Sequence, residues 1–376
     1  MRNILILLSF MFILLSCSKE EKEDLPKDPI ILPPYNPTYV DLNDRLPSYL
    51  PRMDIPADNK TTIEGIELGR ALFYEPLLSG DGTQSCGSCH NQSYGFTDNG
   101  KKFSTGIDQV EGNRNSMQII NAGLRTSFFW DGRAATLEDQ AFGPVTNPIE
   151  MHEKWPRAVA KINDISTYRE MGYKAFGVVQ LDSVLISKAI AQFERSIISG
   201  NSKYDRWKKG EYQMTPQEDY GRKLFNKDRD EIRDSLGNVI QVIPGADCFH
   251  CHGDLSDFTD NLFHNNGMDE IFTDPGREKV TGNAYDRGKF KVPTLRNIEH
   301  TAPYMHDGRF KTLDEVIDHY SDGLVHSATI DPLMKNVDIG GVRLSLSEKA
   351  ALKAFLLTLS DPDFLDNPDY SEPPPL

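Results

Sequence analysis

The sequence predicts a mainly α-helical protein built from two related domains with long loops. Three observations predict this class: apolar residues recur with helical spacing, no alternating stretch indicates a convincing strand, and several short sequences occur twice in the same order. The chain has 376 residues, which is enough for two ordinary domains. We expect these domains over residues 45–210 and 211–360, followed by a tail over residues 361–376.

Three short sequences, each present twice, indicate an internal duplication. The pairs are LGRALF (68–73) with YGRKLF (220–225), QSCGSCHNQ (84–92) with ADCFHCHGD (246–254), and WDGRAATLED (130–139) with HDGRFKTLDE (306–315). A single match could arise by chance, whereas three in the same order are not expected by chance. Each domain should therefore hold one copy of each sequence.

Two segments give the clearest helical signals. Residues 183–198 carry apolar side chains on one helical face and are expected to close the first domain. Residues 345–359 begin with a Ser345-x-x-Glu348 capping box, and the apolar residues that follow form one stripe. Both segments are therefore predicted to be helices.

The N-terminus has the features of a secretory leader. An apolar run over residues 4–15 is too short for a typical membrane span. The sequence LLSC, which ends the leader over residues 1–17, resembles a bacterial lipoprotein signal with Cys17 as the lipidated residue; an ordinary cleaved signal is the alternative. A charged, proline-rich tether follows over residues 18–44. We expect an exported protein on the periplasmic side, attached to a bacterial membrane only through its N-terminal lipid.

The cysteines point to a particular cofactor. Of five cysteines, the four beyond Cys17 all lie in two Cys-x-x-Cys-His motifs, formed by Cys86, Cys89 and His90 and by Cys248, Cys251 and His252. Such a motif could be a redox dithiol, half of a zinc site or the attachment point of a c-type haem. A dithiol or an all-cysteine zinc site would not need the adjoining histidine. Covalent haem uses all three residues, so the motifs predict two c-type haems in two cytochrome-c-like domains.

The composition and net charge indicate which kinds of macromolecule could bind this protein. At 38% hydrophobic and 26% charged residues, the chain is typical of a soluble globular protein after removal of the leader. Its net charge of −15 disfavours nucleic acid and suits a basic or neutral protein partner. A well-solvated acidic surface explains the same charge equally well.

Long, ordered matches make the chain similar to bacterial di-haem cytochrome c peroxidases, a superfamily that includes the MauG-type maturation enzyme. The resemblance covers roughly residues 45–360 and rests on LFYEPLLSGDGTQSCGSCHNQSYGFTDNG, FFWDGRAATLEDQAFGP, AIAQFERSIISGNSKYDRW and FKVPTLRNIEHTAPYMHDGRFKTLDEVIDHY. In this family the N-terminal haem cleaves hydrogen peroxide, and the C-terminal haem passes on electrons from a small redox protein. The resemblance therefore implies a donor of the cytochrome c or cupredoxin type. Related peroxidases often form homodimers, although the sequence identifies no interface.

The resemblance also implies roles for single residues. His90 and His252 would be the proximal iron ligands, and Trp130 would be a bridge for electrons between the haems. Gln140 and Glu150 would line the peroxide pocket, where Glu150 would move a proton from bound peroxide to the leaving oxygen. From the pattern alone, Trp130 is equally a core residue, and Gln140 and Glu150 are ordinary polar surface residues.

A calcium ion between the domains is a further implication. Asn115, Thr301 and Pro303 match the positions that hold calcium in the family. Oxygen ligands of this kind suit calcium, although loop residues of these types are usually turn formers.

A first departure from the family concerns the N-terminal haem. The well-studied peroxidases place a second histidine on this iron shortly after a Ser-x-Gly stretch, whereas the matching residue here is Ile107. No histidine lies between His90 and His152. We therefore expect the first iron to be open to peroxide at rest, without prior reduction of the second haem. His152 is the rival ligand, and a solvated loop histidine is the simpler interpretation.

A second departure concerns the C-terminal haem. Peroxidases have a methionine as its second ligand, and that position matches Tyr320, as in MauG-type proteins. Thr312-x-x-Glu315 is typical of a capping box at the start of a helix. Tyr320 falls on the same helical face as the apolar residues that lie between this capping box and Tyr320. Tyr320 should therefore point inward, while His319 turns away from that face.

The sequence leaves other candidates for the second ligand of the second iron. A core tyrosine hydrogen-bonded to a haem propionate is the alternative role of Tyr320, and Met305 and Met334 are outside candidates for the ligand. An oxygen ligand in place of methionine would stabilise ferric iron and lower the potential of this haem. It would then accept electrons less readily from an ordinary cytochrome c.

Three functions follow. The leading one is an exported di-haem peroxidase that reduces hydrogen peroxide to water with electrons from a small periplasmic donor. The alternative, which Ile107 and Tyr320 favour, is a MauG-type enzyme that uses peroxide to oxidise residues of a partner protein. A pure electron-transfer cytochrome ranks last, because the sequence offers no evident second ligand for the first iron.

Overall fold

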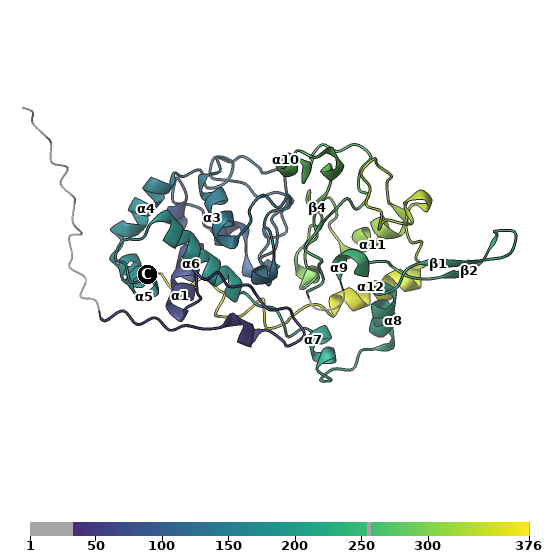
Figure 1. The fold of residues 1–376 in the computed structure, drawn as a ribbon, viewed down its shortest axis with the longest axis horizontal. Helices are drawn as coiled ribbons and strands as arrows, with labels where there is room; N and C mark the ends of the chain where they lie inside the picture. The colour runs from purple at the N-terminus through teal and green to yellow at the C-terminus, as the bar shows by residue number, and fades with distance from the viewer. Residues whose placement is uncertain (1–32, 254–256, 376) are drawn as a thin grey trace, which may run out of the picture. The chain divides into compact units, whose positions relative to one another are not determined.

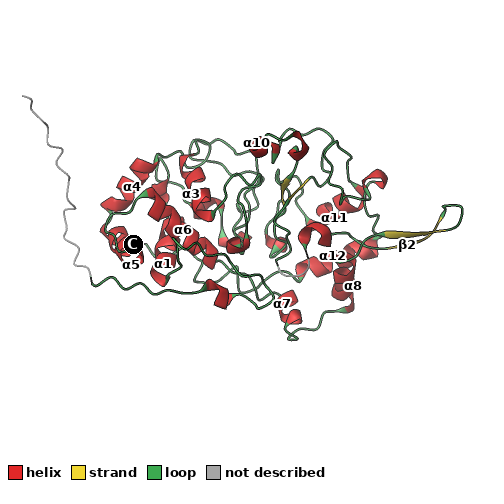
Figure 2. Ribbon diagram, viewed as in Figure 1, coloured by secondary structure: helices red, strands yellow, loops and turns green. Residues whose placement is uncertain are grey.

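The computed structural model describes residues 33–253 and 257–375, and it confirms the mainly helical class (Figure 1). The α-helices are α1 (Ile63–Phe73), α2 (Cys86–Cys89), α3 (Leu137–Thr146), α4 (Trp155–Asp164), α5 (Ser166–Phe176), α6 (Ser183–Ser196), α7 (Lys203–Lys208), α8 (Pro216–Phe225), α9 (Phe249–His252), α10 (Glu278–Thr281), α11 (Leu313–Asp322) and α12 (Leu346–Leu357). Long loops connect these helices (Figure 2). Cys17 and the expected leader lie outside the described residues.

The helices predicted from sequence are present. The segment expected over residues 183–198 is α6. Ser345 caps α12 and exchanges hydrogen bonds with Glu348, as the capping box predicts. Thr312 and Glu315 do the same at the start of α11. Local sequence therefore sets the first turn of both helices in the second half.

Each half is built on a pair of helices that cross at a glycine. α1 packs on α6 in the first half, and α8 packs on α12 in the second. A Cβ atom on Gly69 would lie 1.9 Å from the main-chain oxygen of Ala189, and a Cβ atom on Gly221 would lie 1.9 Å from that of Ala351. Because no side chain fits at such distances, the glycine of LGRALF and YGRKLF is explained by the helix crossing.

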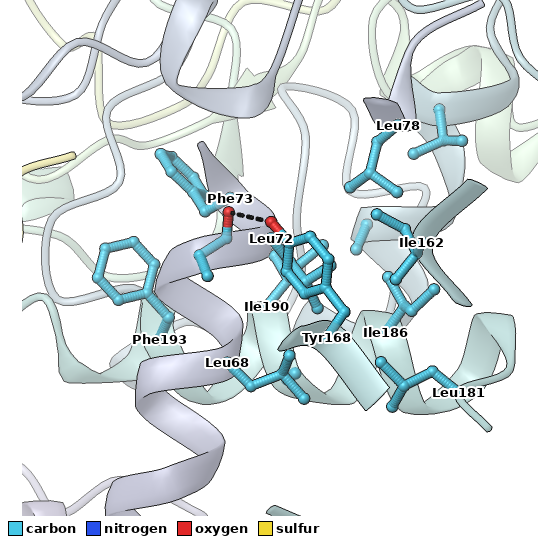
Figure 3. Close-up of a cluster of buried hydrophobic side chains, with 14 of the residues drawn as sticks. Leu68, Leu72, Phe73, Leu78, Ile162, Tyr168, Leu181, Ile186, Ile190 and Phe193 are labelled. Carbon is cyan, nitrogen blue, oxygen red and sulfur yellow. Dashed lines mark hydrogen bonds between the residues drawn. The ribbon is translucent and has the colours of Figure 1, made fainter. Parts of the chain in front are cut away.

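Equivalent aromatic side chains fill the two cores. Phe73 packs edge-on against Phe193, with ring centroids 5.3 Å apart, and both are fully buried. Figure 3 shows these rings among the aliphatic side chains of the first core. In the second core Phe225 and Phe355 take the same positions, with centroids 5.2 Å apart. The duplication therefore extends from the motifs to the packing.

Four short strands form two small antiparallel sheets among the described residues. They are β1 (Asp230–Arg233), β2 (Val239–Ile243), β3 (Phe263–His264) and β4 (Phe290–Lys291). The expectation of no convincing strand was wrong for β1 and β2, which form a hairpin extending beyond α8 (Figure 1). Most of its side chains are exposed, so burial imposes no alternating pattern on the sequence.

The end of the chain returns to the first half. Phe364 and Tyr370 belong to the first hydrophobic core. The side-chain amide of Gln92, just after the first haem motif, donates to the main-chain oxygens of Phe364, at 3.0 Å, and Asn367, at 2.9 Å. Residues that we expected to form a tail therefore pack beside the first Cys-x-x-Cys-His motif. Among the described residues, no helix is both long and apolar enough to cross a membrane.

Candidate active site

The two Cys-x-x-Cys-His motifs share one local geometry. Nδ1 of His90 lies 2.8 Å from the carbonyl oxygen of Phe96, and Nδ1 of His252 lies 3.0 Å from that of Phe258. Because a carbonyl can only accept, each Nδ1 carries the proton and each Nε2 keeps the lone pair that could bind iron. Burial lowers the pKa of both histidines, which favours the neutral imidazole that metals bind.

The cysteines help to distinguish the three possible uses of the motif, namely a redox dithiol, half of a zinc site and the attachment point of a haem. Cys86, Cys89, Cys248 and Cys251 form no disulfide with one another. Burial raises the pKa of Cys89 to about 11 and that of Cys248 and Cys251 to about 12, the reverse of a reactive redox dithiol. Within residues 33–253 and 257–375, no three His, Cys, Asp or Glu side chains cluster as a metal site, so the two cysteine pairs do not combine into one zinc site. The residues at both motifs fit a covalently attached haem.

A cavity in the second half, which we call the second cavity, lies against the second Cys-x-x-Cys-His motif. Its lining includes the two motif cysteines, His252 and three candidate second ligands, namely Tyr320, Met305 and Met334. Tyr320 therefore faces the cavity, as the helical periodicity predicts. His319 does not line the cavity; it is buried, and its Nε2 lies 3.2 Å from the main-chain oxygen of Asn266. Burial raises the pKa of Tyr320 well above its usual value.

Trp130 lies where the two halves meet. Its indole Nε1 donates to the main-chain oxygen of Asn115 at 2.8 Å, and its own carbonyl accepts from the main-chain N–H of Lys291 at 2.8 Å. The ring meets the edge of His306, which stacks on Phe290 with centroids 3.6 Å apart. Burial lowers the pKa of His306 to about 4. Trp130, a residue of the first half, and His306 both line the second cavity.

The predicted peroxide-pocket acid, Glu150, lies in a tight turn after α3. The Asn147 side chain donates to Oε1 of Glu150 at 2.7 Å, and the main-chain oxygen of Asn147 accepts from the N–H of Glu150. Burial raises the pKa of Glu150, while the Asn147 hydrogen bond and the charge of Arg133 act against the rise. Gln140 lies half-buried on α3, which leads into this turn.

Ile107 and His152 flank the same turn. The main-chain N–H of Ile107 donates to the main-chain oxygen of Glu150 at 3.0 Å, which brings the loop of Ile107 against the turn. The His152 side chain is 54% exposed and pairs through Nδ1 with Asp108. His152 is therefore a solvent-facing loop residue in this structure.

The residues expected to hold calcium are only partly brought together. The main-chain N–H of Asn115 donates to the main-chain oxygen of His306 at 2.7 Å, which links Asn115 to the segment that contains Thr301 and Pro303. The Asn115 amide donates to the main-chain oxygens of Lys101 and Lys102. Thr301 is buried. The structure records no direct bond from Asn115 to Thr301 or Pro303 among its described residues.

Comparison with known proteins decides the family. A family model described as di-haem cytochrome c peroxidase matches residues 63–213. The chain is 34% identical to cytochrome c551 peroxidase of Nitrosomonas europaea, over 82% of this chain and 82% of that protein. It is also 34% identical to methylamine utilization protein MauG of Methylorubrum extorquens, over 81% of this chain and 80% of that protein.

The chain belongs to the di-haem cytochrome c peroxidase family. It is therefore a peroxidase, an oxidoreductase that carries two haems. The fold of this peroxidase matches a solved MauG-like protein associated with microbial copper homeostasis, with a TM-score of 0.76 and 35% identity over 87% of this chain and 98% of that one. The family and the geometry of the two motifs agree on the cofactor.

Sequence reasoning missed several polar residues around the peroxidase sites. Asn147, which holds Glu150, lies in the sequence NPIE, where an asparagine before proline indicates only a turn. Arg114 donates to Asp131 at 2.7 Å and makes two bonds to Asp274, and it thereby ties the Trp130 loop to the second half. Asp131 and Asp274 lie 17 and 160 residues from Arg114 in the sequence, and no spacing rule connects them.

A charged triad beside the second cavity was also missed. Nε2 of His264 lies 2.7 Å from Oδ2 of Asp260, and its Nδ1 lies 2.5 Å from Oδ2 of Asp331. The two carboxylates raise the pKa of His264 to about 9 against the effect of burial, so the imidazole is protonated at neutral pH. This triad ties the segment after the second motif to the loop of Met334.

Proposed function

We propose that this peroxidase is exported, reduces hydrogen peroxide to water with electrons from a small donor protein, and keeps its first iron open to peroxide at rest. The observation that carries the proposal is at residues 107 and 152. Ile107 occupies the position of the family's second histidine, and the exposed His152 side chain is paired with Asp108. Ile107 has no side-chain nitrogen, and the His152 side chain is turned to solvent and to Asp108.

The residues of the pocket supply proton transfer. The bound haems supply the electron-transfer chemistry. Glu150 accepts a proton from one peroxide oxygen and returns it to the other, which leaves as water. Asn147 holds the carboxylate through its 2.7 Å hydrogen bond. Gln140, on the helix that leads into this turn, would line the peroxide pocket as the family resemblance implies. Two electrons and two protons convert each peroxide into two water molecules.

Trp130 carries electrons between the two halves in this proposal. Its hydrogen bonds to both halves and its edge contact with His306 support that role, because they hold one aromatic ring at the boundary. The donor is a small redox protein of the cytochrome c or cupredoxin type that delivers electrons to the second haem. The acidic net charge of −15 supports a basic or neutral donor.

Calcium binding and lipid attachment complete the proposal. Asn115, Thr301 and Pro303 hold a calcium ion through amide and carbonyl oxygens, because calcium prefers oxygen ligands. Cys17 carries the lipid that keeps the enzyme on the periplasmic side of its membrane.

A donor-driven assay tests this function. The purified holoenzyme is mixed with hydrogen peroxide and a reduced small c-type cytochrome or a reduced cupredoxin, starting either fully oxidised or with its second haem reduced. We expect donor oxidation without a lag from both starting states. A lag that only prior reduction removes would overturn the open first iron, and absence of donor oxidation with every donor would overturn the peroxide-reducing role.

Oxidation of a partner protein is the second candidate function. The tyrosine in the second cavity favours it, because MauG-type enzymes have tyrosine at this position. The test is peroxide consumption without a small donor in the presence of candidate partner proteins, followed by mass spectrometry of the partner. A peroxide-dependent mass change in the partner, together with poor turnover of small donors, would favour this function.

A further inference from the structure

Asn266 lies between two candidate iron ligands in the second cavity. Its Nδ2 donates to the hydroxyl oxygen of Tyr320 at 3.0 Å and lies 3.5 Å from Sδ of Met305. All three side chains line the cavity that His252 also lines. The one amide is therefore in contact with two of the three candidate second ligands that line this cavity, Tyr320 and Met305.

The main chain fixes the position of this amide. The Asn266 carbonyl oxygen lies 3.2 Å from Nε2 of His319, and the Asn266 side chain bonds to Tyr320, the next residue of α11. Asn266 is thus held to the helix at two points. The contact between the main-chain oxygen of residue 266 and His319 would remain in any side-chain variant at this position.

The backbone also fixes Met305. Its φ of 74° lies in the left-handed region, which a methionine rarely adopts. Phe129, at the equivalent position of the repeat in the first half, has a φ of 66°. Because both copies of the turn have this conformation, the turn rather than an iron bond accounts for the presence of Met305 in the cavity.

The Asn266 amide forms a stronger hydrogen bond with Tyr320 than with Met305. A phenol oxygen is a good hydrogen-bond acceptor, so the 3.0 Å bond from Nδ2 of Asn266 holds the Tyr320 hydroxyl in place in the cavity. A thioether sulfur is only a weak acceptor, so the same donor contributes little to it. Contact with Asn266 therefore favours an iron bond to tyrosine over an iron bond to methionine.

We propose that Asn266 is a positioning residue that selects Tyr320 over Met305 as the second ligand of the second haem iron. The inference rests on the proposed assignment of Tyr320 as a ligand and adds the residue that makes the choice. It predicts that the ligand changes when the amide is removed, even though Tyr320 stays in the chain.

The experiment compares ferric holoenzymes that carry Asn266→Leu, Asn266→Asp, Tyr320→Phe and Asn283→Leu. The readouts are electron paramagnetic resonance, the far-red absorption of a thioether–iron bond, and the midpoint potential of the second haem. We expect both Asn266 variants to lose the spectral signature that Tyr320→Phe also loses. They should gain far-red thioether absorption, with a rise in midpoint potential. Asn283 is an exposed asparagine of the same half that does not line the cavity, so Asn283→Leu is the control and should keep the wild-type spectrum.

Each outcome decides a separate point. A wild-type spectrum and potential in both Asn266 variants, beside a changed Tyr320→Phe spectrum, would overturn the role of Asn266 and leave the Tyr320 ligand intact. An unchanged Tyr320→Phe spectrum would overturn the ligand assignment and the inference together. If Asn266→Leu does not incorporate haem, the nearly isosteric Asn266→Asp, which lacks the N–H donors, decides the point alone.

Discussion

At the scale of single residues, two backbone carbonyls decide which ring nitrogen of His90 and His252 is available to iron. The sequence predicts both histidines as ligands, because they adjoin Cys-x-x-Cys. It cannot predict the acceptors, since Phe96 and Phe258 owe their carbonyl orientation to left-handed backbone conformations at φ 60° and 55°. The ligand identities could therefore be derived from spacing, whereas the tautomer needed the fold.

Glu150→Gln tests the pocket acid. The amide keeps the size of the side chain but cannot accept a proton, so the rate of the peroxide reaction should fall by about 10²–10⁴-fold. The measurement is the second-order rate constant for peroxide with the haem content held equal. Glu111→Gln, at an exposed position, is the matched control. An unchanged rate in Glu150→Gln would remove Glu150 from the mechanism.

The pH dependence tests the environment of Glu150. The carboxylate is the reactive form and exists above its pKa, which burial raises from the ordinary value of 4.5. The peroxide rate should therefore fall on acidification at a higher pH than an exposed glutamate would give. Asn147→Ala removes a hydrogen bond that lowers this pKa, so the acid limb should move to still higher pH. An acid limb that stays in place would contradict the role of Asn147.

At the scale of elements, the crossed helix pairs explain the repeated sequence LGR/YGR better than any local rule. The sequence predicts the helices from periodicity and capping boxes, and the structure confirms them at α6, α11 and α12. It does not show why a glycine recurs within α1 and α8, since glycine disfavours helices. The reason is contact with a carbonyl of a partner helix more than a hundred residues away. The β1–β2 hairpin escaped prediction because its exposed strands need no alternation.

Gly69→Ala tests the helix crossing. The added Cβ would meet the Ala189 carbonyl at 1.9 Å, so the helices must move apart, at a cost of about 1–3 kcal/mol or more. The thermal unfolding midpoint of the holoprotein measures the loss. Gly112→Ala is the control, because its nearest heavy atom would lie 3.6 Å away. Equal stability of the two variants would refute the packing argument.

At the scale of the whole molecule, the two halves are tied together by contacts that the repeat does not predict. Arg114 bonds to Asp131 and Asp274, and the Trp130 carbonyl accepts from Lys291. The end of the chain packs into the first core instead of extending as a free tail. A duplicated sequence identifies two similar units, but the residues that join them differ between the copies and could not be inferred by alignment.

Phe364→Ala tests the packing of the C-terminal segment on the first half. Phe364 is fully buried against Phe96, so its truncation should cost about 3–5 kcal/mol. Thermal melting followed at the haem absorbance gives the change. Asp366→Ala, at an exposed position in the same segment, should leave the melt unchanged. A similar melt for both variants would mean that the segment contributes nothing to the first core.

The central claim is that the first iron is open to peroxide at rest. The measurement that tests it most directly is rapid mixing of the fully oxidised holoenzyme with one equivalent of hydrogen peroxide, without reductant, followed by absorption. Ile107 and the exposed His152 predict a prompt spectral change of the haem. A spectrum that stays constant until one electron per molecule is supplied would contradict the claim and would mean that another residue closes the first iron.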